Sequence, residues 1–208
     1  MNKPKIIAEI GCNHLGDIKT AIKMIEIAAN FAEVDVVKFQ KRNNKILFSD
    51  DEYNAAHPVP ENSYGNSYGE HRDYLEFDIM THRKLKQVCK KNKIDYSCSV
   101  WDTESAKEIV SLNPKIIKIP SAHNLDFPLL DVVCKKHKGE IHISTGMTTK
   151  KEIKEIFRYL KLKKKLKKTV IYYCVSSYPA KDKDLCMYEI KEFYKKYNED
   201  ILAIGFSG

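Results

Sequence analysis

Two lysine residues interrupt short apolar segments that otherwise have the composition of buried β-strands. Lys38 lies within Val36–Gln40, and Lys118 lies within Ile116–Ile119. A charged ammonium in a strand interior is unstable without an anionic partner. Each lysine alone therefore predicts an internal salt bridge, for Lys38 with Glu9, or a bound anion. Two such lysines favour the anion.

Hydroxyl groups accompany these lysines at or just beyond the ends of the other apolar segments: Ser99, Ser121, Ser144, Ser176 and Ser207. Hydroxyl and ammonium groups together suit a ligand that carries both phosphate and carboxylate. Gln40 is two residues from Lys38 and so shares its face in a strand. Glu9 is the obvious carboxylate of the set and a candidate for proton transfer or water activation.

The elements that must position these groups alternate along the chain, since short β-branched segments are followed by amphipathic helical ones. Thr149 with Glu152 predicts a capping box, and Asp126 before Phe127 and Pro128 predicts another helix start. The apolar segments lack strict alternation, which is typical of parallel strands buried on both faces. The expected strands are Lys5–Ile10, Val34–Gln40, Ile94–Ser99, Lys115–Ile119, Glu140–Ser144, Thr169–Val175 and Ile201–Ser207.

Strict alternation of strands and helices predicts a parallel sheet, either closed as a barrel or open and doubly wound. A glycine-rich phosphate loop, which would favour the open form, is not present. Polar groups at nearly every carboxyl strand end favour the barrel. We expect an α/β fold, a (β/α)8 TIM-type barrel with about seven of its eight strands. Because a barrel's last strand pairs with its first, we expect residues 1–208 to be one truncated barrel domain.

The net charge of +8 raises the question of nucleic-acid binding. Much of it lies in residues 161–168, where Leu162 and Leu166 are four apart and follow Ile153, Ile156 and Leu160. That spacing predicts the buried stripe of a helix whose solvent face is lysine. No aromatic residues alternate with these lysines, so a solvated face is favoured over a binding patch, and we expect no nucleic-acid partner.

Composition also limits the cellular setting. No apolar segment approaches the ~20 residues that span a bilayer, and the N-terminal sequence does not resemble a signal peptide. The six cysteines show no Cys-x-x-Cys pair and no zinc spacing. We therefore expect reduced thiols in a cytoplasmic protein with no membrane partner.

Residues 41–78 break the alternation, because they form a long connection between the second strand and its helix. Such a segment is usually functional or disordered. Its tyrosines, histidines and Asn62 suit a lid that faces a sugar, and an insertion without function is the alternative.

Several of these segments resemble the sialic acid synthase family in sequence and in order. Residues 7–16 (IAEIGCNHLG) and 37–40 (VKFQ) are similar to its opening signature. Residues 117–121 (IKIPS), 143–147 (ISTGM), 174–179 (CVSSYP) and 204–207 (IGFS) resemble its later strand ends. The resemblance covers essentially the whole chain.

The resemblance implies a reaction that spacing alone does not name. In this family phosphoenolpyruvate attacks the aldehyde of an open-chain N-acylated amino sugar, usually N-acetylmannosamine, and a nonulosonic acid and phosphate are released. A divalent metal ion, manganese or magnesium, polarises the aldehyde. Family members pair as homodimers through a small antifreeze-like domain.

Matching positions carry the family's residue roles. Phosphoenolpyruvate is expected to contact Lys38, Ser99, Lys118, Ser121, Ser176 and Ser207, with Ser144 as a further candidate. The sugar is expected to contact Gln40, Asn62 and Tyr178, with His123 beside them. Glu9, Lys38 and Lys118 are the candidate catalytic residues.

Three departures from the family pattern limit this transfer. His123 replaces an acidic residue, and Ser176 replaces an asparagine. The metal-binding histidines and the antifreeze-like domain are expected beyond Gly208, so we expect no metal ligand within the chain and little or no activity from it alone. His14 is expected to orient the first loop rather than to bind metal.

Two other functions stay open. A related synthase would make a legionaminic, pseudaminic or deoxyoctulosonic acid, and the residues that distinguish it are expected at His123 and in residues 41–78. An inactive basic fragment would instead associate with polyanions in a salt-sensitive way that does not depend on Lys38 or Lys118.

Overall fold

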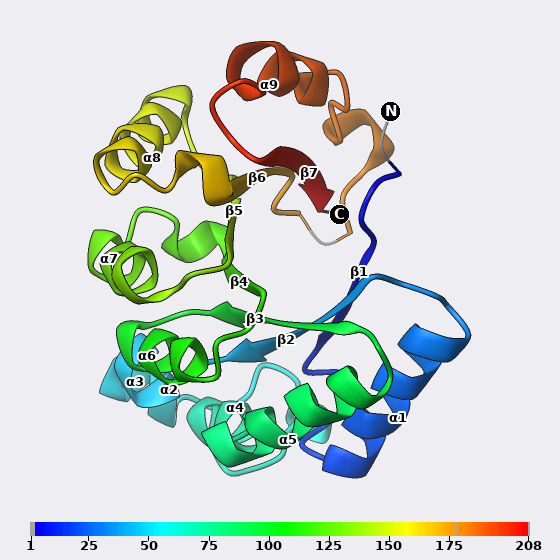
Figure 1. The fold of residues 1–208 in the computed structure, drawn as a ribbon. Coiled ribbons are helices and arrows are strands. Elements are labelled where there is room, and N and C mark those ends of the chain that lie inside the picture. Colours follow the sequence, from blue (N-terminus) through cyan, green and yellow to red (C-terminus); the bar gives the residue numbers. More distant parts are fainter. Residues whose placement is uncertain (1–2, 178, 208) are drawn as a thin grey trace. The chain divides into compact units, whose positions relative to one another are not determined.

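The computed structural model describes residues 3–177 and 179–207. The chain forms two compact units, residues 1–115 and 116–208. Strands and helices alternate along both, in the order expected from the sequence (Figure 1). Among the described residues, no helix is both long enough and apolar enough to cross a lipid bilayer.

The first unit contains three parallel strands, β1 (Ile7–Gly11), β2 (Val36–Lys41) and β3 (Asp95–Val100), with β2 in the middle. Helices α1 (Ile18–Asn30), α5 (Ile79–Lys91) and α6 (Thr103–Ser111) pack against these strands. Val37 and Phe39 of β2 are fully buried, as are Ile25 of α1 and Leu85 of α5. Burial of the apolar residues on both sides of Lys38 fixes β2, and with it the site residues at its end.

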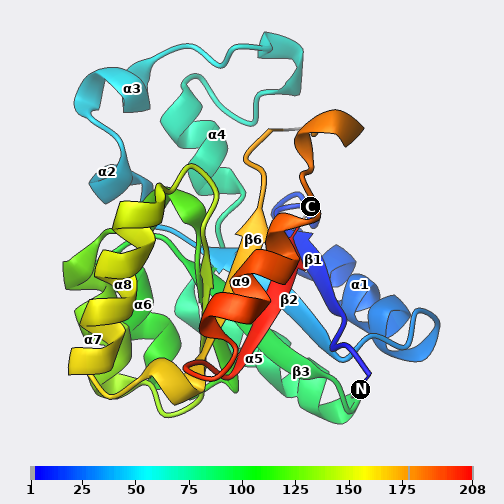
Figure 2. The same cartoon turned by 90° about the horizontal axis from the view of Figure 1, so that it is seen from above.

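Residues 42–78 are folded into short elements: α2 (Asn44–Leu47), α3 (Asp50–Asn54), η1 (Pro60–Asn62) and α4 (Tyr68–Tyr74). A capping box between Ser49 and Glu52 starts α3. The rings of Tyr64 and Tyr74 stack with their centroids 4.5 Å apart. Figure 2 shows α2, α3 and α4 together beyond the carboxyl end of β2. The segment is therefore an ordered insertion at the strand ends.

The second unit contains four parallel strands in sequence order, β4 (Ile116–Ile119), β5 (Glu140–Ser144), β6 (Thr169–Cys174) and β7 (Ala203–Ser207). Three helices, α7 (Phe127–Lys136), α8 (Lys150–Leu162) and α9 (Glu189–Tyr197), connect them. This unit also contains short 3₁₀-helices: η2 (Ser121–His123), η3 (Leu166–Lys168) and η4 (Asp182–Asp184).

The predicted helix starts in this unit are confirmed. Asp126 accepts a hydrogen bond from the Leu129 N–H at the start of α7. Thr149 and Glu152 form the complete capping box of α8.

The predicted buried stripe of one helix is wrong at Leu162 and Leu166. Ile153, Ile156 and Leu160 are buried, but Leu162 is 75% exposed. The physical reason is that Leu162 lies two residues after Leu160, on the opposite face of α8, and the helix ends there. Lys164 then adopts a positive φ of 56°, and Leu166 belongs to η3.

Candidate active site

Lys38 is the buried centre of a polar cluster at the carboxyl ends of the strands of the first unit. Glu9, Lys38 and Ser97 lie side by side in the parallel register of β1, β2 and β3, and Gln40 lies beside Ser99. The Lys38 Nζ donates to the Glu9 carboxylate and to the Ser99 Oγ, the latter at 3.2 Å. The internal salt bridge that was the alternative for Lys38 is therefore present.

Glu9 keeps this pair accessible. Its side chain is 48% exposed, whereas that of Lys38 is 7% exposed. A buried cation with a half-exposed carboxylate is placed to exchange a proton or to hold a polar ligand.

Gln40 brings an amide to the same cluster. A Cβ atom built on Gly11 would lie 3.3 Å from the Gln40 Nε2 and 3.4 Å from the Glu9 Oε1. Gly11 has a φ of 56° and thus needs glycine on two grounds. Within the described part of the chain, the buried Gln40 Oε1 accepts no hydrogen bond. An unsatisfied buried acceptor costs about 1–3 kcal/mol, and a donor on a ligand would remove that cost.

His14 has the structural role expected of it. Its ring stacks on Phe77 at a centroid distance of 4.0 Å, and its Nδ1 accepts from the Gly16 N–H. Burial lowers the pKa of His14 to about 4, so the ring is neutral at physiological pH. His14 thereby fixes the loop after β1.

Asn62 does not join the cluster around Lys38. It lies in η1 of the 42–78 segment, where its side chain is exposed and no hydrogen bond of that side chain is present in the structure as described. Its proposed contact with a sugar stays a prediction.

Lys118 is a half-buried cation on β4 of the second unit. Its Nζ lies 5.1 Å from the centroid of the Tyr172 ring. Within the described residues, no carboxylate lies within 4.0 Å of this ammonium. Partial burial lowers the pKa of Lys118, and the neighbouring Cys174 acts in the opposite direction. A partly buried cation that has no acid partner among the described residues is a candidate for binding an anion.

The Gly146 N–H and two polar side chains meet beyond the end of β4, the strand that contains Lys118. The Gly146 N–H donates to the Ser121 Oγ at 3.0 Å and to the Cys174 Sγ at 3.1 Å. A Cβ atom on Gly146 would collide with the Ser176 Oγ and would lie 3.0 Å from both Ser121 and Cys174. The structure thus brings Ser121 and Ser176 together around Gly146.

The other expected site residues of this unit also lie at or after strand ends, but their surroundings differ from one residue to the next. Ser144 is 3% exposed, and its Oγ has no hydrogen-bond partner among the described atoms. Ser207 ends β7 beside Cys174 in the register. His123 is half-buried in η2, and Tyr178 lies outside the described residues.

Three residues near these groups could not be predicted from the sequence, because neither their spacing nor their composition distinguishes them from residues that only pack in the core. Asn124 is buried and donates to the Ser144 carbonyl and to the Thr148 Oγ1, which ties the loops after β4 and β5 together. Cys174 belongs to the Gly146 cluster, although its sequence context predicts a packed thiol. Tyr172 lies under Lys118.

The sequence profile of the NeuB family matches residues 24–208. The chain belongs to the NeuB family. It is 35% identical over 207 residues to N-acetylneuraminate-9-phosphate synthase of Drosophila melanogaster, covering 98% of this chain and 53% of that protein. It is 33% identical over 211 residues to N,N'-diacetyllegionaminic acid synthase of Campylobacter jejuni, covering 100% of this chain and 61% of the relative.

A solved structure shares the fold of this NeuB-family chain. The sialic acid synthetase of Leptospira borgpetersenii matches with a TM-score of 0.83 and 26% identity, over 99% of this chain and 65% of that one. The expected α/β class is confirmed, with seven strands in the alternating order of a (β/α)8 barrel. The chain spans between about half and two thirds of the length of these three proteins.

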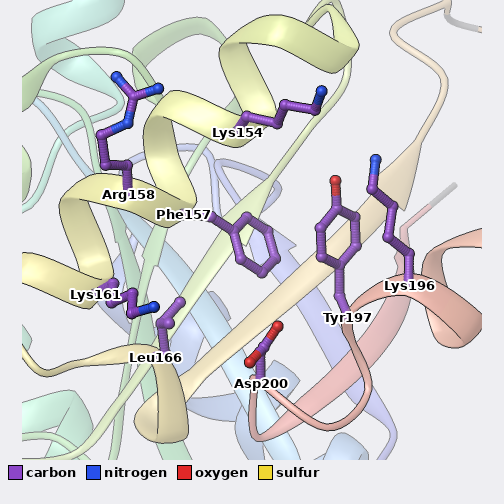
Figure 3. A pocket seen from close by; sticks show the side chains of 8 residues that line it. All are labelled: Lys154, Phe157, Arg158, Lys161, Leu166, Lys196, Tyr197 and Asp200. Carbon is purple, nitrogen blue, oxygen red and sulfur yellow. The ribbon is translucent and has the colours of Figure 1, made fainter.

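The outer surface of the second unit of this NeuB-family chain carries a groove between α8 and α9 with a volume of about 360 Å³. Phe157 and Tyr197 form its apolar floor, with ring centroids 4.2 Å apart. Figure 3 shows Arg158 turned away from these rings, and the lysine ammonium groups at separate points of the rim. The cations do not converge on a common point, which favours the solvated helix face over a binding patch.

The family's expected metal ion has no set of ligands in the part of the chain that is described. There, no three histidine, cysteine, aspartate or glutamate side chains are grouped to hold a cation. No chemical step in this protein is therefore derived through a metal.

Proposed function

We propose that this chain provides the phosphoenolpyruvate site of an enzyme that condenses phosphoenolpyruvate with an open-chain N-acylated amino-sugar aldehyde. The products are a nonulosonic acid and phosphate. The observation that carries the proposal is Lys118, a half-buried ammonium that faces an aromatic ring and has no carboxylate partner among the described residues. Membership of the NeuB family and the names of the relatives support the reaction class.

The reaction forms one carbon–carbon bond and replaces the carbon–oxygen bond between C2 and the phosphate by one between C2 and the oxygen of water. C3 of phosphoenolpyruvate attacks the aldehyde carbon, and the aldehyde oxygen takes a proton to become a hydroxyl. The oxygen of a water molecule bonds to C2 and gives up its first proton. The resulting intermediate collapses to a ketone when the bond from C2 to the bridging oxygen breaks, and the leaving phosphate takes that oxygen and the second proton of the water.

Lys118 is proposed to bind an anionic group of phosphoenolpyruvate. Because no carboxylate neutralises its charge within the described residues, binding need not displace an internal partner. The hydroxyls of Ser121 and Ser176, which lie together around Gly146, supply donors at the same strand ends. Ser144 and Ser207 are the further candidates in this unit.

The Glu9 and Lys38 pair is proposed to handle the proton of the attacking water. Glu9 is half-exposed and carries the negative charge that accepts a proton. Lys38 donates to Glu9, and the Ser99 Oγ in turn accepts from Lys38. Lys38 is also proposed to attract phosphoenolpyruvate when Glu9 turns to the water. Gln40 offers its unsatisfied amide oxygen to a hydroxyl or N–H of the sugar.

A phosphate group in the product shows whether the acceptor sugar is itself phosphorylated. Phosphoenolpyruvate contributes three carbons and loses its phosphate, so a 9-phosphate in the product must come from the acceptor. One relative is named for such a 9-phosphate and another for an unphosphorylated acid. We propose an acceptor of the N-acetylmannosamine type, with related legionaminic, pseudaminic and deoxyoctulosonic precursors as the alternatives. Asn62, His123 and Tyr178 are proposed to select among them.

The test is release of phosphate from phosphoenolpyruvate in the presence of manganese and each candidate sugar, with and without a phosphate on its last carbon. From residues 1–208 alone we expect little or no release, and any release should depend on one sugar and give a product that contains the carbons of both substrates. Release that does not depend on any sugar would contradict the condensation. The metal ligands, the dimer and the cytoplasmic location stay predictions.

Association with polyanions is the alternative from a different class, and variants of the outer groove distinguish it. Replacing Lys154 and Arg158 by glutamine removes two rim charges of the groove. If the chain binds phosphoenolpyruvate for the condensation, this double variant should bind phosphoenolpyruvate as the wild type does. If it associates with polyanions, weaker retention on heparin or RNA should be its main defect.

A further inference from the structure

The Lys118 ammonium rests on an aromatic ring that is itself held by a chain of polar contacts. The Nδ1 of His142 lies 2.8 Å from the Tyr172 hydroxyl, and its Nε2 lies 3.0 Å from the Glu140 carboxylate. Lys118 and His142 are neighbours in the register of β4 and β5. Contacts therefore connect Glu140 to His142, His142 to Tyr172, and Tyr172 to Lys118, along one face of β4, β5 and β6.

The protonation state of His142 decides which atom donates in each contact. The Glu140 carboxylate only accepts, so a neutral His142 ring carries its proton on Nε2 and leaves Nδ1 as an acceptor. The Tyr172 hydroxyl consequently donates to Nδ1. Burial raises the pKa of Tyr172 to about 12, and the Glu140 charge adds to the increase, so the phenol stays neutral.

The opposite side of the ring is shaped by glycine. Gly205 of β7 is the register neighbour of Tyr172. A Cβ atom built on Gly205 would lie 2.6 Å from the Tyr172 ring. The hydrogen bond to His142 and the space above Gly205 thus define one position for the ring.

A ring partner leaves Lys118 available in a way that an acid partner would not. A carboxylate would neutralise the ammonium and compete with an incoming anion. An aromatic face attracts the cation through its quadrupole but carries no net charge. Lys118 can therefore stay charged when the site is empty and still bind an anion.

We propose that Glu140, His142 and Tyr172 are positioning residues that hold the Tyr172 ring beneath Lys118 and so maintain the charged, unoccupied lysine that binds phosphoenolpyruvate. This inference rests on the proposed function, because it assigns Lys118 to that substrate. None of the three residues needs to touch the substrate.

The experiment measures the dissociation constant of phosphoenolpyruvate by calorimetry between pH 6.5 and 9.5 for variants of the ring and its support. Tyr172→Phe keeps the ring and loses its tether, and we expect about fivefold weaker binding. Tyr172→Leu removes the ring, and we expect about tenfold or greater weakening.

The pH dependence of binding is the measurement that a purely structural role of Tyr172 would leave unchanged. Lys118 binds an anion only as the ammonium, and burial already lowers its pKa. Affinity is therefore present at neutral pH and lost as the pH rises through that pKa. Loss of the ring disfavours the ammonium further, so in Tyr172→Leu the affinity should be lost at a lower pH. The Cys174 thiol is the other ionisable group acting on Lys118, and Cys174→Ser tests its share.

Two comparisons control for general damage. Tyr173→Phe removes a neighbouring hydroxyl that donates to the Leu185 carbonyl, and it should leave binding unchanged. His142→Asn can still offer an oxygen to Tyr172 and should bind more tightly than His142→Leu.

The outcomes separate this inference from the function on which it rests. If Lys118→Met abolishes binding while both Tyr172 variants keep the wild-type affinity and pH profile, the positioning chain is wrong and the substrate site stands. If Lys118→Met binds phosphoenolpyruvate normally, the proposed function itself fails.

Discussion

At the scale of single residues, Lys38 and Lys118 show two solutions to the same electrostatic problem. Lys38 is held by the Glu9 carboxylate and Ser99, whereas Lys118 lies over a tyrosine ring. Their segments are alike in sequence, and a salt bridge to Glu9 was expected only as the alternative to a bound anion for Lys38. The difference between the two lysines depends on strand register, which places Glu9 beside Lys38.

The Gly146 cluster was predictable only in part. Ser121 and Ser176 were expected because they follow strands, a position that parallel sheets bring to one edge. Cys174 and Asn124 were not expected, since nothing in their spacing distinguishes them from packed residues. Their roles depend on hydrogen bonds between loops that are far apart in the sequence.

Gly146→Ala tests this cluster. The added methyl group would collide with the Ser176 Oγ and crowd Ser121 and Cys174. We expect a loss of about 1–3 kcal/mol in the free energy of unfolding and weaker phosphoenolpyruvate binding. Urea denaturation and calorimetry measure the two effects.

The double variant Gly146→Ala with Ser176→Ala identifies the cause of the loss. Removing the Ser176 hydroxyl relieves the collision, so stability should partly return while binding stays weak. Additive losses of stability in the double variant would show that the collision with Ser176 is not the cause.

At the scale of elements, caps and apolar runs were sufficient to place the regular structure. Each strand begins and ends within about two residues of its expected bounds, because β-branched runs are flanked by clear helix starts. The elements of residues 42–78 could not be placed in this way. Helices as short as α2 and α3 show no helical period, and the segment is held by local caps and aromatic stacking.

The end of α8 gives a prediction at this scale. Leu160 is fully buried and Leu162 is 75% exposed, although both are leucines of one run. We expect Leu160→Ala to lower the free energy of unfolding by about 2–5 kcal/mol and Leu162→Ala to change it by less than about 0.5 kcal/mol. Urea denaturation of the two variants checks this, and equal losses would contradict the helix end at Leu162.

At the scale of the whole molecule, the sequence predicted the family from two features, the alternating order of the strands and the motifs at their carboxyl ends. The match to the NeuB family confirms that prediction. Order and strand-end chemistry are local in sequence, so they could be predicted. The acceptor sugar could not, because the chain spans little more than half of its first relatives, and those relatives are named for different products.

Calorimetric titration of the wild type and Lys118→Met with phosphoenolpyruvate decides whether Lys118 binds this substrate. Methionine keeps most of the apolar stem and removes the charge. We expect about 100-fold weaker binding, the effect of losing a charged hydrogen-bonding partner in a partly buried site. Lys154→Met, on the outer groove, should bind as the wild type does. Equal affinity of Lys118→Met and the wild type would show that Lys118 does not bind phosphoenolpyruvate.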